Sequence, residues 1–427
     1  MKKIVIIGGG ASGLYLATRL GHHFNSTQTR GFKHKAPSAQ ITLVDKNRTH
    51  TWKPLIYRVA AGTLDTSMDA LEYQVHASSN GYEFQLGSLQ SLDRKRQILT
   101  LGAVLNDKGC ELIPPRELEY DYLVICVGSI SDDSNIEGVR EHCIPLDSIE
   151  QAHKFHKHLL DYFLCLETNP DKTLQIAIIG GGCTGVELSA ELVAASRHVS
   201  QYGRIRTGAI DITLVEAEPQ LLPDLPARLG NSAARELSKM GVRILTNCHI
   251  KNVSANSLTT DDGREIPAAI RAWVTRVKAP EFLTQLDGLI TNQRNQIEVE
   301  TTLQSKNDPH IFAIGDCAGC IDGNNQRVPS RALAAQQMAK LCSTNLVALI
   351  ENKSLGHFHY RDRGTLVSLS TNTAVGNLRG ALLRKTLPLR DVLPVWPTTP
   401  STKCTWRQFM AGPRPYCSIY LVKPTAQ

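Results

Sequence analysis

One pattern occurs twice in this sequence and constrains the fold more than any other feature. A short run of apolar, mostly β-branched residues leads into a glycine-rich turn and then a helical pattern, first from Ile4 and again from Ile176. The three glycines of the two turns have the spacing GxGxxG and are Gly8, Gly10 and Gly13 in the first copy and Gly180, Gly182 and Gly185 in the second. In a strand–turn–helix unit the first glycine permits the sharp turn, the second leaves the backbone open, and the third lets helix and strand pack closely. A single copy is a weak signal, but two copies indicate two related folding units.

Each copy also supplies an acidic residue at the end of its second strand. Asp45 follows Ile41–Val44, and Glu216 follows Ile212–Val215. A carboxylate at this point accepts hydrogen bonds from ribose hydroxyls, so each unit is expected to bind a dinucleotide. The acids stand 32 and 31 residues after the last glycine of their turns, against roughly 20 in the usual unit. We attribute the excess to polar insertions near residues 25–39 and 197–209.

Two dinucleotide units in one chain indicate a resident flavin and a diffusible nicotinamide. Glu216 is followed by Ala217 and Glu218, with no arginine or lysine close by in the sequence. A 2′-phosphate would be repelled there, so NADH is favoured over NADPH.

Two further segments fit the flavin unit. Residues 308–316 form an apolar strand that ends in Gly315-Asp316, and residues 120–129 form another strand with a terminal glycine. We expect Asp316 to meet the ribityl or phosphate part of the flavin nucleotide; taken alone, an ordinary strand-end turn explains the segment equally well. The sequence therefore predicts an α/β fold with two Rossmann-like domains, in which the NADH domain is inserted in the FAD domain and a C-terminal region follows. The expected boundaries are 1–150 and 301–350 for the FAD domain, 151–300 for the NADH domain, 351–390 for the C-terminal region and 391–427 for an atypical tail.

Composition excludes several classes of protein. The formal net charge of +7 is too small for its length to indicate a nucleic-acid partner. The eleven cysteines are an odd number scattered through apolar segments, which is typical of reduced thiols in the cytoplasm, and the lone CxxC of Cys317 and Cys320 does not make a zinc ribbon. No metal site is expected. No apolar run approaches the roughly 18 residues of a membrane-spanning helix, so neither a membrane span nor proton pumping is expected.

Four stretches resemble one family more specifically, the type II NADH dehydrogenases, which are single-subunit NADH:quinone oxidoreductases. The stretches are residues 49–55 with 59–62, residues 184–188, residues 331–337 and residues 360–370. The resemblance runs from residue 1 to about residue 390. It implies FAD and NADH as cofactors, quinone as the electron acceptor, and a C-terminal tail that docks on the cytoplasmic face of the membrane. A homodimer is a further candidate assembly.

The resemblance also assigns roles to individual residues. The FAD site would contain Gly8, Gly10, Ala11, Ser12, Gly13, Asp45, Lys53, Gly62, Gly315 and Asp316. The NADH site would contain Gly180, Gly182, Gly185 and Glu216. The catalytic residues would be Glu187 and Gln337, with Gln336 and Gln337 on the quinone side. Ordinary structural explanations compete: Glu187, in the first turn of its helix, would be stabilised by the helix dipole, Gln336 and Gln337 would be solvated, Lys53 would lie in a surface loop, and the strand at 365–370 would only fill the core.

The chain departs from the family pattern at two positions, so alternative functions must also be considered. Leu333 occupies the position of the first family glutamine, and Arg276 replaces a glycine beside the dinucleotides, where its side chain is expected to crowd them. A soluble NADH-dependent reductase with another acceptor and a decayed FAD-binding relative with little turnover are the alternatives. A dithiol reductase is not favoured because no CxxxxC pair follows Asp45. A sulfide:quinone oxidoreductase needs paired catalytic cysteines, and only Cys183 and Cys317 are candidates by their position. Glu216, the acid expected to bind NADH, argues against that activity.

The tail after Arg390 changes character abruptly. Residues 391–400 contain three prolines, which cannot continue a helix, whereas the family has helices here. Restoring one base before Asp391 permits a proline-free string with apolar and aromatic residues at helical spacing. We therefore expect the tail to be read in a shifted frame, with the protein peripheral on the membrane if the tail is restored and soluble in the cytoplasm as written.

Overall fold

The first glycine turn lies in a mixed sheet of eight strands within the described part of the chain. The computed structural model describes residues 1–25, 38–50, 52–65, 70–169, 171–201, 206, 208–370 and 373–378. The strands are β1 (Lys2–Ile7), β2 (Ala39–Asp45), β5 (Glu83–Leu86), β11 (Tyr122–Ile125), β22 (Ile297–Val299), β23 (Gln304–Ser305), β24 (Asp308–Ala313) and β25 (Ala318–Cys320). Their order is β25-β22-β23-β24-β11-β1-β2-β5, and β1 pairs in parallel with both β2 and β11.

The second glycine turn lies in a parallel sheet of five described strands. They are β13 (Ile144–Pro145), β14 (Leu174–Ile179), β15 (Ile210–Val215), β16 (Arg243–Leu245) and β20 (Ile270–Trp273). The order is β13-β20-β14-β15-β16. Since the first sheet takes its strands from residues 2–125 and 297–320, and this one from residues 144–273, the second unit is inserted in the first as predicted.

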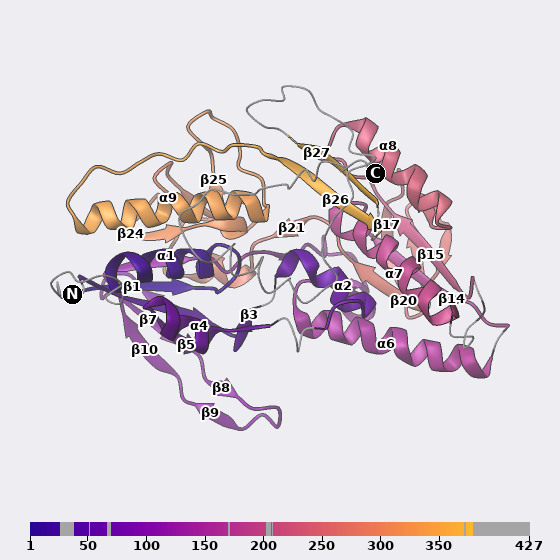
Figure 1. Cartoon of the computed structure of the whole chain (residues 1–427), viewed down its shortest axis with the longest axis horizontal. Coiled ribbons are helices and arrows are strands. Elements are labelled where there is room, and N and C mark those ends of the chain that lie inside the picture. The colour runs from indigo at the N-terminus through magenta and orange to yellow at the C-terminus, as the bar shows by residue number, and fades with distance from the viewer. Residues whose placement is uncertain are drawn as a thin grey trace, which may run out of the picture. The chain divides into compact units, whose positions relative to one another are not determined.

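Helices cover the sheets because the crossover connections of parallel strands place them there. They are α1 (Gly13–Asn25), α2 (Ile56–Ala61), α4 (Tyr73–Asn80), α5 (Val139–His142), α6 (Ile149–Thr168), α7 (Cys183–Gln201), α8 (Ala227–Lys239) and α9 (Ala332–Ile350), with the 3₁₀ turns η1 (Lys53–Leu55), η2 (Glu281–Gln285) and η3 (Gly315–Cys317). Figure 1 shows α1 and α9 beside β1 and β24, and α6, α7 and α8 grouped around β14, β15 and β20. Helix α2, although it lies in the first segment of the chain, contacts both α6 and α7 of the second group.

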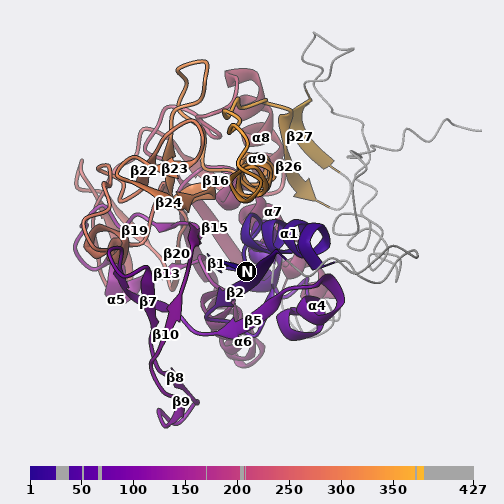
Figure 2. The same ribbon diagram turned by 90° about the vertical axis from the view of Figure 1, so that its left-hand side faces the viewer.

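Smaller antiparallel elements complete the chain. They are β3 (Thr49–His50) with β4 (Leu71–Glu72); β6 (Leu89–Asp93), β7 (Ile98–Leu101) and β10 (Arg116–Glu119); β8 (Val104–Leu105) with β9 (Glu111–Ile113); β12 (Ile130–Ser131) with β21 (Val277–Lys278); β17 (Ile250–Val253), β18 (Ser257–Thr260) and β19 (Glu265–Pro267); and β26 (Gly364–Ser370) with β27 (Thr373–Leu378). Figures 1 and 2 show the β8–β9 hairpin extending away from the two sheets, whereas β26 and β27 lie beside α7 and α8.

The core of each unit forms around the predicted apolar strands. Ile4–Ile7 of β1 and Ile176–Ile179 of β14 are buried along their whole length, as expected for strands covered on both faces. The α/β fold class and the helices after both turns are confirmed, whereas the exact domain boundaries stay a prediction. Residues 197–201, the start of the expected polar insertion, continue α7 as regular helix. The tail at 391–427 lies outside the described residues.

Candidate functional site

The two glycine turns have nearly the same geometry. The amide of Gly8 donates to the carbonyl of Val44 at 2.8 Å, and that of Gly180 donates to the carbonyl of Val215 at 2.8 Å. Gly8 and Gly180 have φ angles of +103° and +114°, which disfavour any residue with a side chain. Both turns therefore begin with a glycine for a steric reason that lies in the backbone itself.

The third glycine of each turn is enforced by close packing. A Cβ atom on Gly13 would stand 1.8 Å from the carbonyl oxygen of Gly8, and one on Gly185 would stand 1.9 Å from that of Gly180. The second glycines are different, because a Cβ on Gly10 or on Gly182 would meet no atom within 4 Å. The space beside these two backbones is open, as a pyrophosphate group requires.

The acidic residues reach back to the middle of each turn. Asp45 Oδ2 accepts a hydrogen bond from the Gly9 amide at 2.6 Å, and Glu216 Oε2 accepts one from the Gly181 amide at 2.6 Å. The second oxygens accept from the amides of Asn47 and Glu218. Burial raises the pKa of Asp45, and the Gly9 and Asn47 amides oppose that shift. Two positioned carboxylates beside two open glycine turns fit two dinucleotides.

Asp316 and Lys53, two more of the predicted FAD residues, both bind Ser129. Asp316 Oδ2 accepts from Ser129 Oγ at 2.8 Å, and Lys53 Nζ donates to the Ser129 carbonyl at 2.7 Å. Burial raises the pKa of Asp316, and the Ser129 hydroxyl opposes the shift. A Cβ on Gly315, whose φ is +77°, would stand 3.1 Å from Ser12 Oγ, so this segment lies against the start of α1.

Gly62 is placed elsewhere. It ends α2 in the left-handed conformation, and a Cβ there would stand 2.1 Å from the His156 ring on α6. Its contacts indicate a helix cap and a packing position between α2 and α6.

Glu187 lies on α7, where this helix packs against α2 and β26. It is the fifth residue of α7 and not in the first turn, so the helix-dipole explanation loses its basis. Its Oε1 accepts from the amide of Ser368 on β26 at 3.0 Å. Burial raises its pKa to about 8, with a smaller contribution from Glu191 and an opposing one from the Ser368 amide. Glu187 therefore holds a proton at neutral pH.

Helix α9 also contacts this region. Its N-cap residue, Arg331, donates from Nη1 to Thr365 Oγ1 of β26 at 3.0 Å. The side-chain amide of Gln337 binds the backbone of Arg361. Nε2 donates to the Arg361 carbonyl at 3.0 Å, and Oε1 accepts from the Arg361 amide at 3.1 Å. Gln336 is half-buried on the same helix, and Leu333 is 38% exposed.

The structure corrects one expectation about the nicotinamide site. No basic residue was expected near Glu216 and Glu218, yet Arg276 forms an ion pair with Glu218 from 58 residues away. Its side chain is 75% exposed and directed towards Glu218. The sequence could not reveal this pair, because the partners lie on segments that only the sheet brings together.

Cys183 and Cys317, the two candidates by position, are not a thiolate pair. Burial raises the pKa of the Cys183 thiol to about 11 and that of Cys317 to about 12. The nine cysteines in the described ranges are all free thiols. The Cys183 and Cys317 thiols are therefore protonated at neutral pH, which does not support dithiol chemistry between them.

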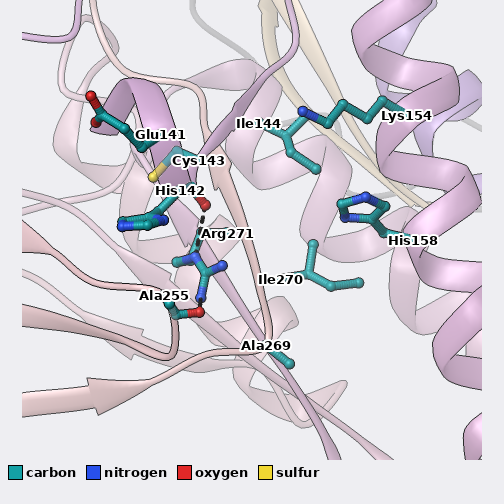
Figure 3. A pocket seen from close by; sticks show the side chains of 10 residues that line it. All are labelled: Glu141, His142, Cys143, Ile144, Lys154, His158, Ala255, Ala269, Ile270 and Arg271. Atoms are coloured by element: carbon teal, nitrogen blue, oxygen red, sulfur yellow. Dashed lines mark hydrogen bonds between the residues drawn. The ribbon is translucent and has the colours of Figure 1, made fainter. Parts of the chain in front are cut away.

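A cavity of about 170 Å³ lies away from both turns. Figure 3 shows Arg271 at its wall, where the guanidinium donates to the carbonyls of His142 and Ala255, with His158 and Lys154 of α6 opposite. A third bond goes to the carbonyl of Ala268. Arg271 thus ties backbone segments together.

Sequence reasoning missed Ser129, Ser368 and Glu191. Ser129 ended a strand that was recognised, and Glu191 stands one helical turn after Glu187, so both carried a weak signal. Glu191 contacts Arg58 at 3.5 Å and accepts from Thr63 Oγ1. Ser368 contributes only its amide, which no side-chain pattern can reveal. In the described ranges no helix is both long and apolar enough to cross a bilayer.

Comparisons with known proteins agree with this geometry. Residues 2–339 match the pyridine nucleotide-disulphide oxidoreductase family. A type II NADH:quinone oxidoreductase of Haemophilus influenzae is 43% identical over 88% of this chain and 87% of its own length, and one of Staphylococcus epidermidis is 26% identical over 92% and 95%. The structure of NDH2 from Plasmodium falciparum in complex with NADH has a similar fold, with a TM-score of 0.77, 17% identity and coverage of 96% and 94%. The chain therefore belongs to the pyridine nucleotide-disulphide oxidoreductase family and, within it, to the type II NADH:quinone oxidoreductases.

Proposed function

We propose that this chain carries electrons from NADH through FAD to a quinone, with the first glycine turn holding FAD and the second holding NADH. In both turns the amide of the residue after the first glycine donates a hydrogen bond to the acid, from Gly9 to Asp45 and from Gly181 to Glu216. This repeated hydrogen bond supports the assignment of two dinucleotides. When bound, FAD supplies the chemistry that accepts a hydride from NADH and passes two electrons to the quinone.

The FAD site is proposed to include Ser12, Lys53, Gly315 and Asp316. Ser129 supports it by donating to Asp316 and accepting from Lys53, which fixes both charged groups. Gly62 is proposed as a helix cap that positions α2 against α6.

The quinone site is proposed where α7, α9 and β26 meet. Reduction of a quinone to a quinol needs two electrons and two protons, and Glu187 holds a proton at neutral pH because burial raises its pKa to about 8. Leu333 and Leu366 expose 38% and 51% of their surfaces on α9 and β26, which suits an apolar acceptor. Gln337 is proposed to position the backbone at residue 361.

Redox titration of the yellow protein tests the function. Under anaerobic conditions NADH should bleach the flavin absorbance, and a short-chain quinone should restore it. Bleaching without reoxidation by quinone would point to a reductase with another acceptor. No bleaching would point to an FAD-binding relative that has lost turnover.

We also propose a membrane partner and a subunit partner. The chain is proposed to bind the cytoplasmic face of the membrane through its C-terminal segment when that segment is intact, and to form a homodimer. Flotation with lipid vesicles tests the first proposal, and light scattering after gel filtration tests the second.

A further inference from the structure

The ion pair of Arg276 and Glu218 joins two segments that flank the second glycine turn. Arg276 follows β20, and Glu218 follows β15. In the sheet β14 lies between these two strands, and β14 leads directly into Gly180–Gly182. The partners thus approach each other from opposite sides of the turn that is proposed to hold NADH.

Strand spacing indicates that the pair bridges the ends of β15 and β20 across β14. Neighbouring strands lie about 4.8 Å apart, so β15 and β20 are separated by roughly 10 Å at their ends. The turn is bound to both sides: Gly181 donates to Glu216 beyond β15, and a Cβ on Gly180 would stand 2.5 Å from the Val274 carbonyl beyond β20. Two long side chains that meet end to end cover this distance, which neither could cover alone.

The position of Glu218 identifies which part of a nucleotide the guanidinium faces. Glu218 is two residues beyond Glu216, and its amide donates to Glu216 Oε1 at 2.9 Å. Glu216 is the acid proposed to bind the adenosine ribose. The Arg276 guanidinium is therefore held beside the ribose edge, where a 2′-phosphate would project.

Charge at this edge differs from what the sequence alone indicates. Two carboxylates without a basic partner would repel a 2′-phosphate strongly, but Arg276 neutralises Glu218 and stays 75% exposed. Arginine binds phosphate with paired, charge-assisted hydrogen bonds, whereas an exposed ion pair with a carboxylate is weak. A 2′-phosphate can thus replace Glu218 as the partner of Arg276.

We propose that Arg276 determines coenzyme selectivity in this chain by weakening the discrimination against a 2′-phosphate, so that the nicotinamide site accepts NADP(H) as well as NAD(H). This inference rests on the proposed NADH site at the second glycine turn. Arg276 takes no part in the redox step; it binds the nucleotide and changes its own partner when the 2′-phosphate is present.

Calorimetric titration of the FAD-loaded protein with NAD⁺ and NADP⁺ tests this without any turnover. Arg276→Gly should raise the Kd for NADP⁺ about tenfold and leave the Kd for NAD⁺ within about twofold. Arg276→Gln should act in the same way with less change to the backbone, and Arg276→Lys should retain part of the NADP⁺ affinity. Glu218→Gln should tighten NADP⁺ binding, because it removes a negative charge and releases the guanidinium.

Arg96→Gly is the matched control, since Arg96 forms an exposed ion pair with Asp93 in the first unit. Its nucleotide affinities should equal those of the unmodified protein. Salt should weaken NADP⁺ binding more steeply in the unmodified protein than in Arg276→Gly. Equal changes in both Kd values, or tighter NADP⁺ binding in Arg276→Gly, would overturn the inference alone. Failure of the unmodified protein to bind either nucleotide would overturn the proposed site and this inference together.

Discussion

Replacing Glu187 by glutamine removes a titrating group while keeping the shape of the side chain. Glutamine can still accept from the Ser368 amide, which donates to Glu187 Oε1 at 3.0 Å. Burial raises the pKa of Glu187 from 4.5 to about 8, which corresponds to about 5 kcal/mol in favour of the protonated form. At pH 7 about nine-tenths of the folded molecules hold this proton.

The sign of the stability effect follows from proton binding. Between pH 4.5 and about 8 the unfolded chain has released the proton and the folded chain has kept it, so stability falls as pH rises. The limiting slope for this single proton is about 1.4 kcal/mol per pH unit. Glu187→Gln should therefore raise the melting temperature relative to the unmodified protein by an amount that grows from pH 5 to pH 8 and then stays constant.

The rate with quinone should change in parallel. With pre-reduced protein in a stopped-flow instrument, reoxidation by a short-chain quinone should be constant below pH 8 and fall about tenfold per pH unit above it. Glu187→Gln should lower the rate at pH 7 by about 100-fold and remove the pH dependence. Glu236→Gln, on the surface of α8, should change neither. A break near pH 8 that persists in Glu187→Gln would refute the role of this carboxyl as the proton source.

Three further predictions follow from other parts of the structure. Gly13→Ala should prevent folding of the first unit, since its Cβ would stand 1.8 Å from the Gly8 carbonyl oxygen. Gly10→Ala should fold but lose FAD affinity, because its Cβ enters the open space beside the turn. Circular dichroism and flavin content distinguish the two variants, and equal behaviour of both would contradict the open space beside Gly10. Ser129→Ala should weaken FAD retention by about 1–2 kcal/mol because Asp316 loses its donor at 2.8 Å, and an unchanged off-rate on dilution would count against this network. Adding one base after the Arg390 codon should move the protein from the soluble to the membrane fraction; membrane binding by the protein as written, with the frame confirmed by resequencing, would dismiss the shifted frame.

Local features were readable in the sequence because they depend on backbone conformation and on neighbours along the chain. The first glycine of each turn is required by its φ angle, and the third by a contact within a few residues, such as that of Gly13 with Gly8. Apolar runs covered on both faces predicted β1 and β14, and the acids at the ends of the second strands followed from the repeat. The α/β fold and the insertion of one unit in the other were determined at this level.

The site itself was decided by contacts between distant segments. Glu187 meets the Ser368 amide across 181 residues, and Asp316 meets Ser129 across 187 residues. Strand order brings Arg276 to Glu218 and so reduces the negative charge expected at the ribose edge. The pKa of Glu187 arises from burial where α7 packs against α2 and β26, a property of the packed molecule that no spacing of residues specifies. Sequence determines which backbone turns form, whereas the charge and protonation of the site depend on which elements the tertiary structure packs around them.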